Sequence, residues 1–166
     1  MEKRAAARWT SGMDFVASNE DGATVALSNS TTDFRPSALV LGALAGCTGM
    51  DAILVMTKKR LQVTRYEVGA VGQQRDDYPR SFTDIVVTHT VEGASLDDVA
   101  VHRAIDLSAR KYCQVGANLA SGDATISHRV RIIDESGDRT FDCVTVGPRG
   151  AGLAHHEGMA AADRQS

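Results

Sequence analysis

Hydrophobic and polar positions alternate along much of this chain, and one long apolar stretch interrupts the alternation. Between Pro36 and about Leu61, apolar residues surround most of the circumference of a helix, which predicts a helix buried on most sides. Pro36 suits the first helical position because it has no backbone N–H to leave unpaired there. Lys58-Lys59-Arg60 places cations at the negative end of the helix dipole. The pattern therefore predicts one long central helix.

Shorter extended segments lie on both sides of this helix. The turn Asn19-Glu20-Asp21-Gly22 is typical of a hairpin, and partial alternation with β-branched residues predicts two long antiparallel strands after the helix. Ser95 is expected to cap a second helix that ends at Arg110-Lys111. The predicted strands are 8–10, 13–17, 23–27, 64–71, 82–91 and 124–133, with a short helix over 114–120.

The pattern weakens near the end of the chain. We predict one domain over residues 1–133 and a C-terminal extension over residues 134–166. The extension is expected to contain one short strand, over 141–146, followed by a mobile tail rich in Gly, Ala and charge.

Composition narrows the class of protein. Hydrophobic residues make up 43% of the 166 residues, which is enough for a core. The formal charge of −3 argues against a nucleic-acid partner, which would need a basic face. We find no apolar run that approaches a membrane span of about 20 residues, and no secretory signal at the start. These observations predict a soluble, cytoplasmic protein with no nucleic-acid or membrane partner.

The three cysteines are too few for a disulfide scaffold in a chain of this length. Cys47 lies in the long helix, and Cys113 precedes a helix start, where free N–H groups stabilise a thiolate. From the residues alone, the simpler interpretation is that both are small buried hydrophobic residues, which is the commonest fate of a free cysteine. Cys143 lies in a weak segment and is expected to be a bystander.

The residues around Cys47 define a candidate pocket. Gly46 and Gly49 leave room beside the sulfur, and glycines inside a helix also indicate close packing or a kink. Met50 and Asp51 complete the pocket. Asp51 lies one helical turn from Cys47, where it is either a site residue or a helix cap or ion-pair partner. A carboxylate there would oppose thiolate formation.

Metal and cofactor sites are not predicted. His155-His156 with Glu157 lacks the spacing of a zinc site, and no glycine-rich loop joins a strand to a helix with phosphate-binding spacing. His89, His102 and His128 are expected to be surface or packing residues.

Two motifs carry a resemblance to a known family. The stretch from Arg35 to Asp51, which contains Ala-Gly-Cys-Thr-Gly, is similar to the first cysteine motif of the OsmC/Ohr family. The stretch from Lys111 to Ala120, Lys-Tyr-Cys-Gln-Val-Gly-Ala-Asn-Leu-Ala, is similar to the second. Residues 5–133 resemble the YhfA-related branch of OsmC-like proteins, element by element.

The resemblance implies an α/β (α+β) fold with antiparallel sheets, a long central helix and an intertwined homodimer whose sites lie between subunits. It implies a thiol peroxidase without a cofactor that reduces organic hydroperoxides. Cys47 would attack the peroxide as a thiolate and become a sulfenic acid. Cys113 would resolve it to a disulfide, and a dithiol reductant of the dihydrolipoyl type would reduce that disulfide.

The sequence departs from the family in the groups that assist the thiol. The family usually has a glutamate just after the motif proline, and here Ser37 and Ala38 occupy the candidate positions. That glutamate holds an arginine, for which Arg35 and Arg8 are the candidates. Two other functions therefore stay open on the same fold: a non-catalytic protein that binds a small hydrophobic ligand, and a thiol-redox partner of other proteins.

Overall fold

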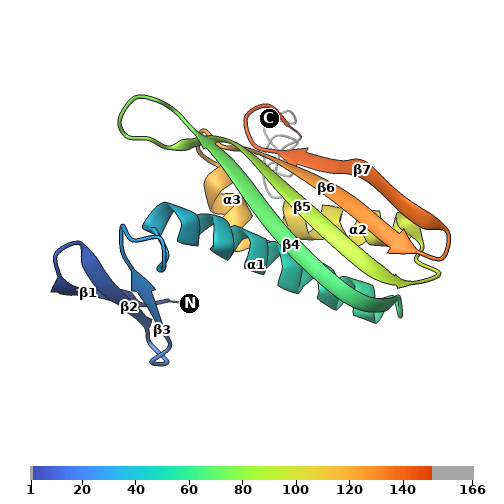
Figure 1. The fold of residues 1–166 in the computed structure, drawn as a ribbon. Helices are drawn as coiled ribbons and strands as arrows, with labels where there is room; N and C mark the ends of the chain where they lie inside the picture. Colours follow the sequence, from blue (N-terminus) through green and yellow to red (C-terminus); the bar gives the residue numbers. More distant parts are fainter. Residues whose placement is uncertain (1, 151–166) are drawn as a thin grey trace, which may run out of the picture. The chain divides into compact units, whose positions relative to one another are not determined.

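The computed structural model describes residues 2–150 and divides the chain into two compact units, one up to Leu41 and one from Gly42 onward. The first unit contains a three-stranded sheet, and the second contains a four-stranded sheet with its helices (Figure 1). The mixed α/β fold expected from the family resemblance is confirmed.

The first unit is an antiparallel meander of β1 (Ala5–Ser11), β2 (Asp14–Asn19) and β3 (Thr24–Leu27), in that order across the sheet. The predicted turn joins β2 to β3. Asn19 Oδ1 accepts hydrogen bonds from the N–H groups of Asp21 and Ala23, and Gly22 takes a φ of 85°. An asparagine that bonds its own downstream backbone, with a glycine at positive φ, is a standard way to close a hairpin.

The long helix α1 (Pro36–Lys58) begins at the predicted proline. Arg60 then takes a φ of 61°, so the helix ends before Leu61. The helix is long and apolar enough to cross a membrane by length and composition, which corrects the expectation that no apolar run approaches such a span; 33% of its most apolar stretch is buried. The core helix of a globular protein passes the same test.

The second sheet consists of β4 (Gln62–Gln74), β5 (Phe82–Ala94), β6 (Thr125–Asp134) and β7 (Gly137–Val146), in that order. β4 and β5 are antiparallel, as predicted, and β6 and β7 are antiparallel as well. β5 and β6 are parallel, which corrects the expectation of antiparallel sheets. Parallel neighbours need a crossover connection. Here the connection contains α2 (Asp98–Leu107), a π-helical segment η1 (Ser108–Tyr112) and α3 (Gln114–Ala120).

The helices lie on one face of the second sheet (Figure 1). Along β5, the buried residues are Ile85, Val87, His89 and Val91, at every second position, so a single face of the strand is covered. Aliphatic side chains from α1, α2, β5 and β6 form the main core: Ala52, Met56, Val91, Val101, Ala104, Ile105, Val130 and Ile132, together with Leu96.

The cap of α2 differs from the prediction. The Asp97 carboxylate accepts hydrogen bonds from the N–H groups of Val99 and Ala100, so Asp97 is the N-cap. Ser95 takes a φ of 48°, and its N–H and hydroxyl donate to the Glu135 carboxylate. Asp97 and Asp98 follow Ser95 closely in the sequence. Asp97 is the cap because its carboxylate lies within hydrogen-bonding distance of the first free N–H groups of α2.

The C-terminal extension contributes to the second sheet. β7 is longer than the strand predicted over 141–146, and Val146 at its end is 1% exposed. Arg139 fixes this strand, since its guanidinium lies 2.8 Å from Asp98 Oδ1 and 2.8 Å from Asp134 Oδ1. The tail predicted to be mobile, including His155-His156 and Glu157, lies outside the described residues from position 151 onward.

Candidate functional site

Cys47 and Cys113 meet in the second unit. Cys47 lies on α1 and is partly exposed, whereas Cys113 lies between η1 and α3 and is 3% exposed. The two Sγ atoms and a carboxylate oxygen of Asp51 all lie within 4.8 Å of one another, and both cysteines are free thiols. The structure therefore brings together the two cysteines that the family resemblance paired.

The π-helical segment η1 positions Cys113. The Cys113 N–H donates to the carbonyl of Ser108, five residues earlier, at 2.9 Å, which is the bond of a π-helix. Cys113 is then the N-cap of α3, and its Sγ accepts a hydrogen bond from the Gly116 N–H at 3.3 Å. The backbone on both sides of Cys113 thus holds its sulfur in one place.

Thr48 and Ser108 join α1 to η1 beside the sulfur. The Thr48 hydroxyl lies 2.8 Å from the Leu44 carbonyl and 3.3 Å from Cys113 Sγ, so its proton is shared between these two acceptors. The Ser108 hydroxyl donates to the Thr48 carbonyl at 3.1 Å. Both hydroxyl side chains are completely buried, and these bonds satisfy them.

Burial dominates the chemistry of Cys113. It raises the pKa of the Cys113 thiol to about 11, the hydrogen bond from Thr48 and that from the Gly116 N–H act in the opposite direction, and Cys47 raises the pKa further. The stabilisation expected from the helix start is therefore present but is outweighed by burial. Cys113 is protonated in the reduced protein and needs a base before it can react.

Asp51 carries an unsatisfied carboxylate oxygen at the same place. Its Oδ2 is buried and has no hydrogen-bond partner among residues 2–150. Burial raises the pKa of this carboxyl, and a hydrogen bond with Ser108 partly offsets the rise. Asp51 lies within α1 and caps no helix. A buried oxygen that the fold leaves unpaired is unusual and requires an explanation.

The other predicted pocket residues separate into two groups. Gly49 is buried, and a Cβ there would lie 3.1 Å from Val68 Cγ2, so α1 approaches β4 too closely for a side chain. Gly49 is therefore a packing glycine, as predicted. Gly46 is exposed, and a Cβ at that position would meet no atom within 4 Å; Met50 is 74% exposed. Within one chain, Gly46 and Met50 leave the site open on the solvent side of α1.

The two candidate arginines lie in the first unit. Arg8 is exposed on β1, opposite Val16 of β2. Arg35 directly precedes α1, and its carbonyl accepts from the Leu39 N–H at 3.0 Å. Cys47 belongs to the second unit, so the assignment of either arginine to the thiol stays a prediction.

A second buried polar group escaped prediction. Tyr66 Oη lies 2.7 Å from His89 Nδ1, and His89 Nε2 lies 3.1 Å from His128 Nδ1. Burial lowers the pKa of His89 to about 3, with help from His128, and lowers that of His128 to about 4. Burial also raises the pKa of Tyr66. His89 and His128 are packing residues, as expected, but they form a neutral chain of hydrogen bonds across β4, β5 and β6.

Cys143 and His102 lie apart from the two thiols. Cys143, on β7, is outside the group of sulfurs and carboxylate, and burial raises the pKa of its thiol to about 12, with smaller contributions from Asp106 and Asp142. His102 Nε2 lies 3.0 Å from the Cys143 carbonyl oxygen, and the His102 ring stacks on Phe141.

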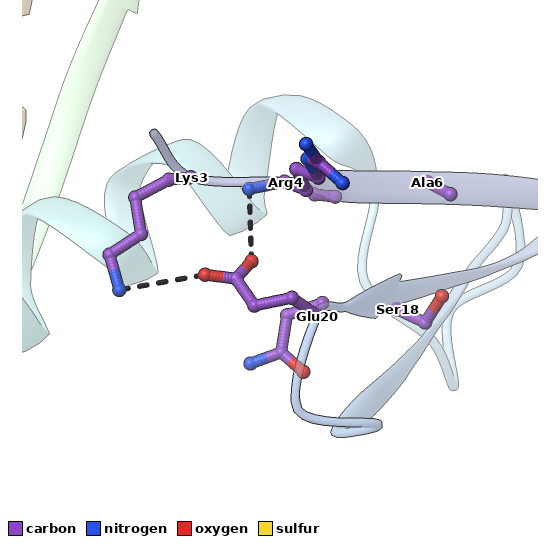
Figure 2. Close-up of a pocket in the computed structure, with 7 residues that line it drawn as sticks. Lys3, Arg4, Ala6, Ser18 and Glu20 are labelled. Atoms are coloured by element: carbon purple, nitrogen blue, oxygen red, sulfur yellow. Dashed lines mark hydrogen bonds and ion pairs between the residues drawn. The ribbon is translucent and has the colours of Figure 1, made fainter. Parts of the chain in front are cut away.

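The first unit has a shallow hollow of its own, of about 650 Å³, where the start of β1 pairs with the end of β2 (Figure 2). The Glu20 carboxylate accepts from the Arg4 N–H at 2.9 Å and lies 3.5 Å from Lys3 Nζ, so it neutralises charge there (Figure 2). The hollow contains no cysteine or histidine. Its lining residues are Lys3, Arg4, Ala5, Ala6, Ser18, Asn19 and Glu20.

Fold and site together define a class of protein: a two-sheet α/β protein with a pair of thiols held between a long helix and a π-helical turn. The sequence matches the family described as OsmC-like protein over residues 28–129. It is 33% identical over 132 residues to Protein YhfA of Escherichia coli strain K12, covering 78% of this chain and 98% of that one. The chain belongs to the OsmC-like family, and the resemblance noted from its two cysteine motifs is confirmed.

Solved structures share the fold. The OsmC-like protein from Mycoplasma pneumoniae has a TM-score of 0.70 at 15% identity, covering 80% of this chain and 98% of its own. The organic hydroperoxide resistance protein OhrB of Bacillus subtilis has a TM-score of 0.53 at 16% identity, covering 78% and 98%. At these identities the likeness shows the fold alone.

Proposed function

We propose that this protein reduces organic hydroperoxides with Cys47 and Cys113 as a dithiol–disulfide pair. The observation that carries the proposal is the placement of both sulfurs and the Asp51 carboxylate within 4.8 Å of one another. Two thiols at that separation can form a disulfide with small side-chain movements. Cys47, which is partly exposed, is the thiol that a peroxide reaches first.

Asp51 supplies the proton transfer that the first step needs. The carboxylate takes the proton of the Cys47 thiol, and the thiolate attacks the outer peroxide oxygen. An S–O bond forms and the O–O bond breaks, which oxidises sulfur by two electrons. The departing alkoxide takes the proton back from Asp51 and leaves as the alcohol. A raised pKa suits Asp51 to both halves of this exchange, because it accepts and returns a proton more readily near neutral pH.

The second step uses the same carboxylate. Because burial keeps Cys113 protonated, its attack on the sulfenic acid requires a base. Asp51 takes the Cys113 proton, the S–S bond forms, and the S–O bond breaks. The departing hydroxide takes the proton and leaves as water. An external dithiol of the dihydrolipoyl type then reduces the disulfide by thiol exchange. The cycle requires a reducing compartment, and we assign the protein to the cytoplasm.

The solvent side of α1 supports a homodimer. Met50 is 74% exposed and Leu54 is 54% exposed, one turn apart on a helix that carries the site. Apolar side chains of this size on one helix face mark an interaction surface. We assign this face to a second copy of the chain, which would cover the open side of the site beside Gly46 and Met50.

The activity is tested by following cumene hydroperoxide consumption with dihydrolipoamide as reductant. Cys47→Ser should abolish turnover, and Cys113→Ser should allow at most one turnover before Cys47 is over-oxidised. Cys143→Ser is the matched control and should keep wild-type turnover, since Cys143 lies outside the site.

Wild-type protein that consumes no hydroperoxide with any dithiol would refute the peroxidase. A bound apolar ligand whose affinity is the same in Cys47→Ser would then establish the binding protein. Disulfide exchange with other proteins that depends on both cysteines would establish the redox partner.

The homodimer is tested by replacing Met50 with glutamate and measuring mass in solution. Met50→Glu should convert the dimer to a monomer, because it places a charge in the apolar contact. Val99→Glu is the control, as Val99 is 77% exposed on α2. A monomeric wild type, or a Met50→Glu variant that stays dimeric, would exclude this surface.

A further inference from the structure

The reduced site has the composition of a metal centre as well as that of a dithiol. Cys47, Asp51 and Cys113 each offer one ligand atom, and these three atoms lie within 4.8 Å of one another. Sequence spacing gave no sign of such a site, because two ligands come from α1 and the third follows η1. The expectation of no metal rested on the spacing of His155, His156 and Glu157 and on the scattered positions of the other histidines, and it did not consider the cysteines together with Asp51.

The unpaired oxygen of Asp51 is the second observation that indicates a cation. Asp51 Oδ2 is buried and has no hydrogen-bond partner in the described part of the chain. The hydroxyl groups close by leave this oxygen unpaired: that of Thr48 bonds the Leu44 carbonyl and Cys113 Sγ, and that of Ser108, which also interacts with the Asp51 carboxyl, bonds the Thr48 carbonyl. A carboxylate oxygen that the protein does not satisfy is free to bind a ligand from outside.

We propose that the reduced protein binds one thiophilic divalent cation of the zinc class through Cys47 Sγ, Cys113 Sγ and the Asp51 carboxylate. Zinc binds thiolate sulfur at about 2.3 Å and carboxylate oxygen at about 2.0–2.2 Å, which places two tetrahedral sulfurs roughly 3.8 Å apart. The present separations reach that geometry by side-chain adjustment. Both thiol protons leave to solvent as the metal–sulfur bonds form.

The surroundings of Cys113 suit a metal-bound thiolate. Its sulfur already accepts hydrogen bonds from the Thr48 hydroxyl and the Gly116 N–H. Donors of this kind stabilise the charge on a ligating sulfur and fix its orientation. Three protein ligands leave a fourth position for water or an external thiol, on the partly exposed side of Cys47.

Metal binding and peroxide reduction exclude each other. The metal occupies the sulfur that a peroxide would attack, and formation of the Cys47–Cys113 disulfide removes two of the three ligands. The site therefore holds the cation only while it is reduced and releases it on oxidation.

The test titrates the reduced, metal-free full-length protein with Cd²⁺ and follows the ultraviolet thiolate-to-cadmium charge-transfer absorption. Zn²⁺ is then added as a competitor. We expect one Cd²⁺ per chain, displaced by Zn²⁺. Cys47→Ser and Cys113→Ser should each lose the absorption at this site, and Cys143→Ser should keep it. Asp51→Asn, which preserves shape, should weaken binding at least tenfold.

Circular dichroism and thermal unfolding establish that each variant is folded, and wild type oxidised with diamide provides a test that needs no variant: it should not bind. Binding that survives in Cys47→Ser or in oxidised protein would overturn the site. Equal affinity in Asp51→Asn and wild type would remove Asp51 from the ligand set and overturn the three-ligand proposal. The titration does not depend on peroxidase activity, so a protein inactive toward hydroperoxides can still bind Cd²⁺, and an active one can fail to.

Discussion

Two groups of buried polar side chains in the second unit are built in opposite ways. The Tyr66–His89–His128 chain satisfies its members with each other, and burial keeps both histidines neutral. The Cys47–Asp51–Cys113 group leaves Asp51 Oδ2 unpaired and holds a protonated thiol beside a carboxyl whose pKa is raised. Buried polar side chains that are all hydrogen-bonded stabilise the fold, whereas a buried group without a partner is available to bind a ligand or to transfer a proton.

The contrast makes the histidine chain the place where a substitution should cost most stability. His89→Leu leaves the Tyr66 hydroxyl and His128 buried without their partner, which should lower the free energy of unfolding by about 2–6 kcal/mol. Chemical denaturation measures this. The control His102→Leu loses one hydrogen bond at a partly exposed position and should cost less than about 1.5 kcal/mol. Hydroperoxide turnover of the folded His89→Leu protein should stay near wild type; a large loss of turnover with unchanged stability would reverse the comparison.

The opposite result is expected at Asp51. Asp51→Asn keeps the shape but cannot accept a proton, so the second-order rate with hydroperoxide should fall about 100-fold, equivalent to about 2.7 kcal/mol. Unfolding should be unchanged or harder, since an unsatisfied carboxyl is removed from a buried position. Asp142→Asn is the surface control, because its ion pair with Arg129 is exposed. An Asp51→Asn variant with wild-type rate and lowered stability would make Asp51 structural.

Acid should act on the histidine chain before it acts on most carboxylates. His89 and His128 titrate near pH 3 and pH 4 when folded and near 6.5 when unfolded. Below pH 6.5 the unfolded chain therefore binds more protons, and each histidine lowers the free energy of unfolding by about 1.4 kcal/mol per pH unit until its folded pKa is reached. Urea unfolding between about pH 6.5 and pH 4 tests this. His128→Phe should reduce the slope of the free energy of unfolding against pH by the contribution of one histidine. An unchanged slope would show that His128 is not buried in its neutral form.

The smallest effect is expected at Thr48, which belongs to the site but is satisfied. Thr48→Val removes the hydroxyl that donates to Cys113 Sγ, so the pKa of Cys113 should rise further and disulfide formation should slow about fivefold. A single-turnover measurement, in which peroxide is added once and disulfide formation is followed, isolates this step. Faster resolution in Thr48→Val would mean that the hydroxyl restrains the thiol instead of assisting it.

Much of the fold could be predicted from the hydrophobic pattern and the turn residues of the sequence. Pro36 marked the start of α1, and Asn19 with Gly22 marked the β2–β3 hairpin, because these residues act through their own local geometry. The parallel pairing of β5 with β6 was not predicted, although the long helical connection between them carried the signal. Asp97 replaced Ser95 as the cap because the cap depends on which side chain reaches the first free N–H groups.

The site was predictable only in part. The sequence separation of Cys47 and Cys113 does not predict that they lie close together. Their pairing was predicted from the resemblance of two motifs to a known family. The role of Asp51 could not be settled, because burial, which raises its pKa, is set by packing from other elements. The Tyr66–His89–His128 chain required strand register: His89 lies opposite Val68 on β4 and Val130 on β6, so its neighbours are known only once the sheet is formed.

The π-helical segment η1 makes the site sensitive to insertions and deletions in the course of evolution. A π-helical turn contains one residue more than an α-helical turn would need over the same span. Deleting a single residue between Ser108 and Tyr112 would restore α-helical bonding and rotate everything that follows by about 100° relative to α2. Cys113 would then face a different direction, with its sequence motif intact. The position of the Cys113 sulfur relative to Cys47 thus depends on the number of residues in η1. A protein with one residue fewer in this segment would keep both cysteines in its sequence but would no longer bring their sulfurs together.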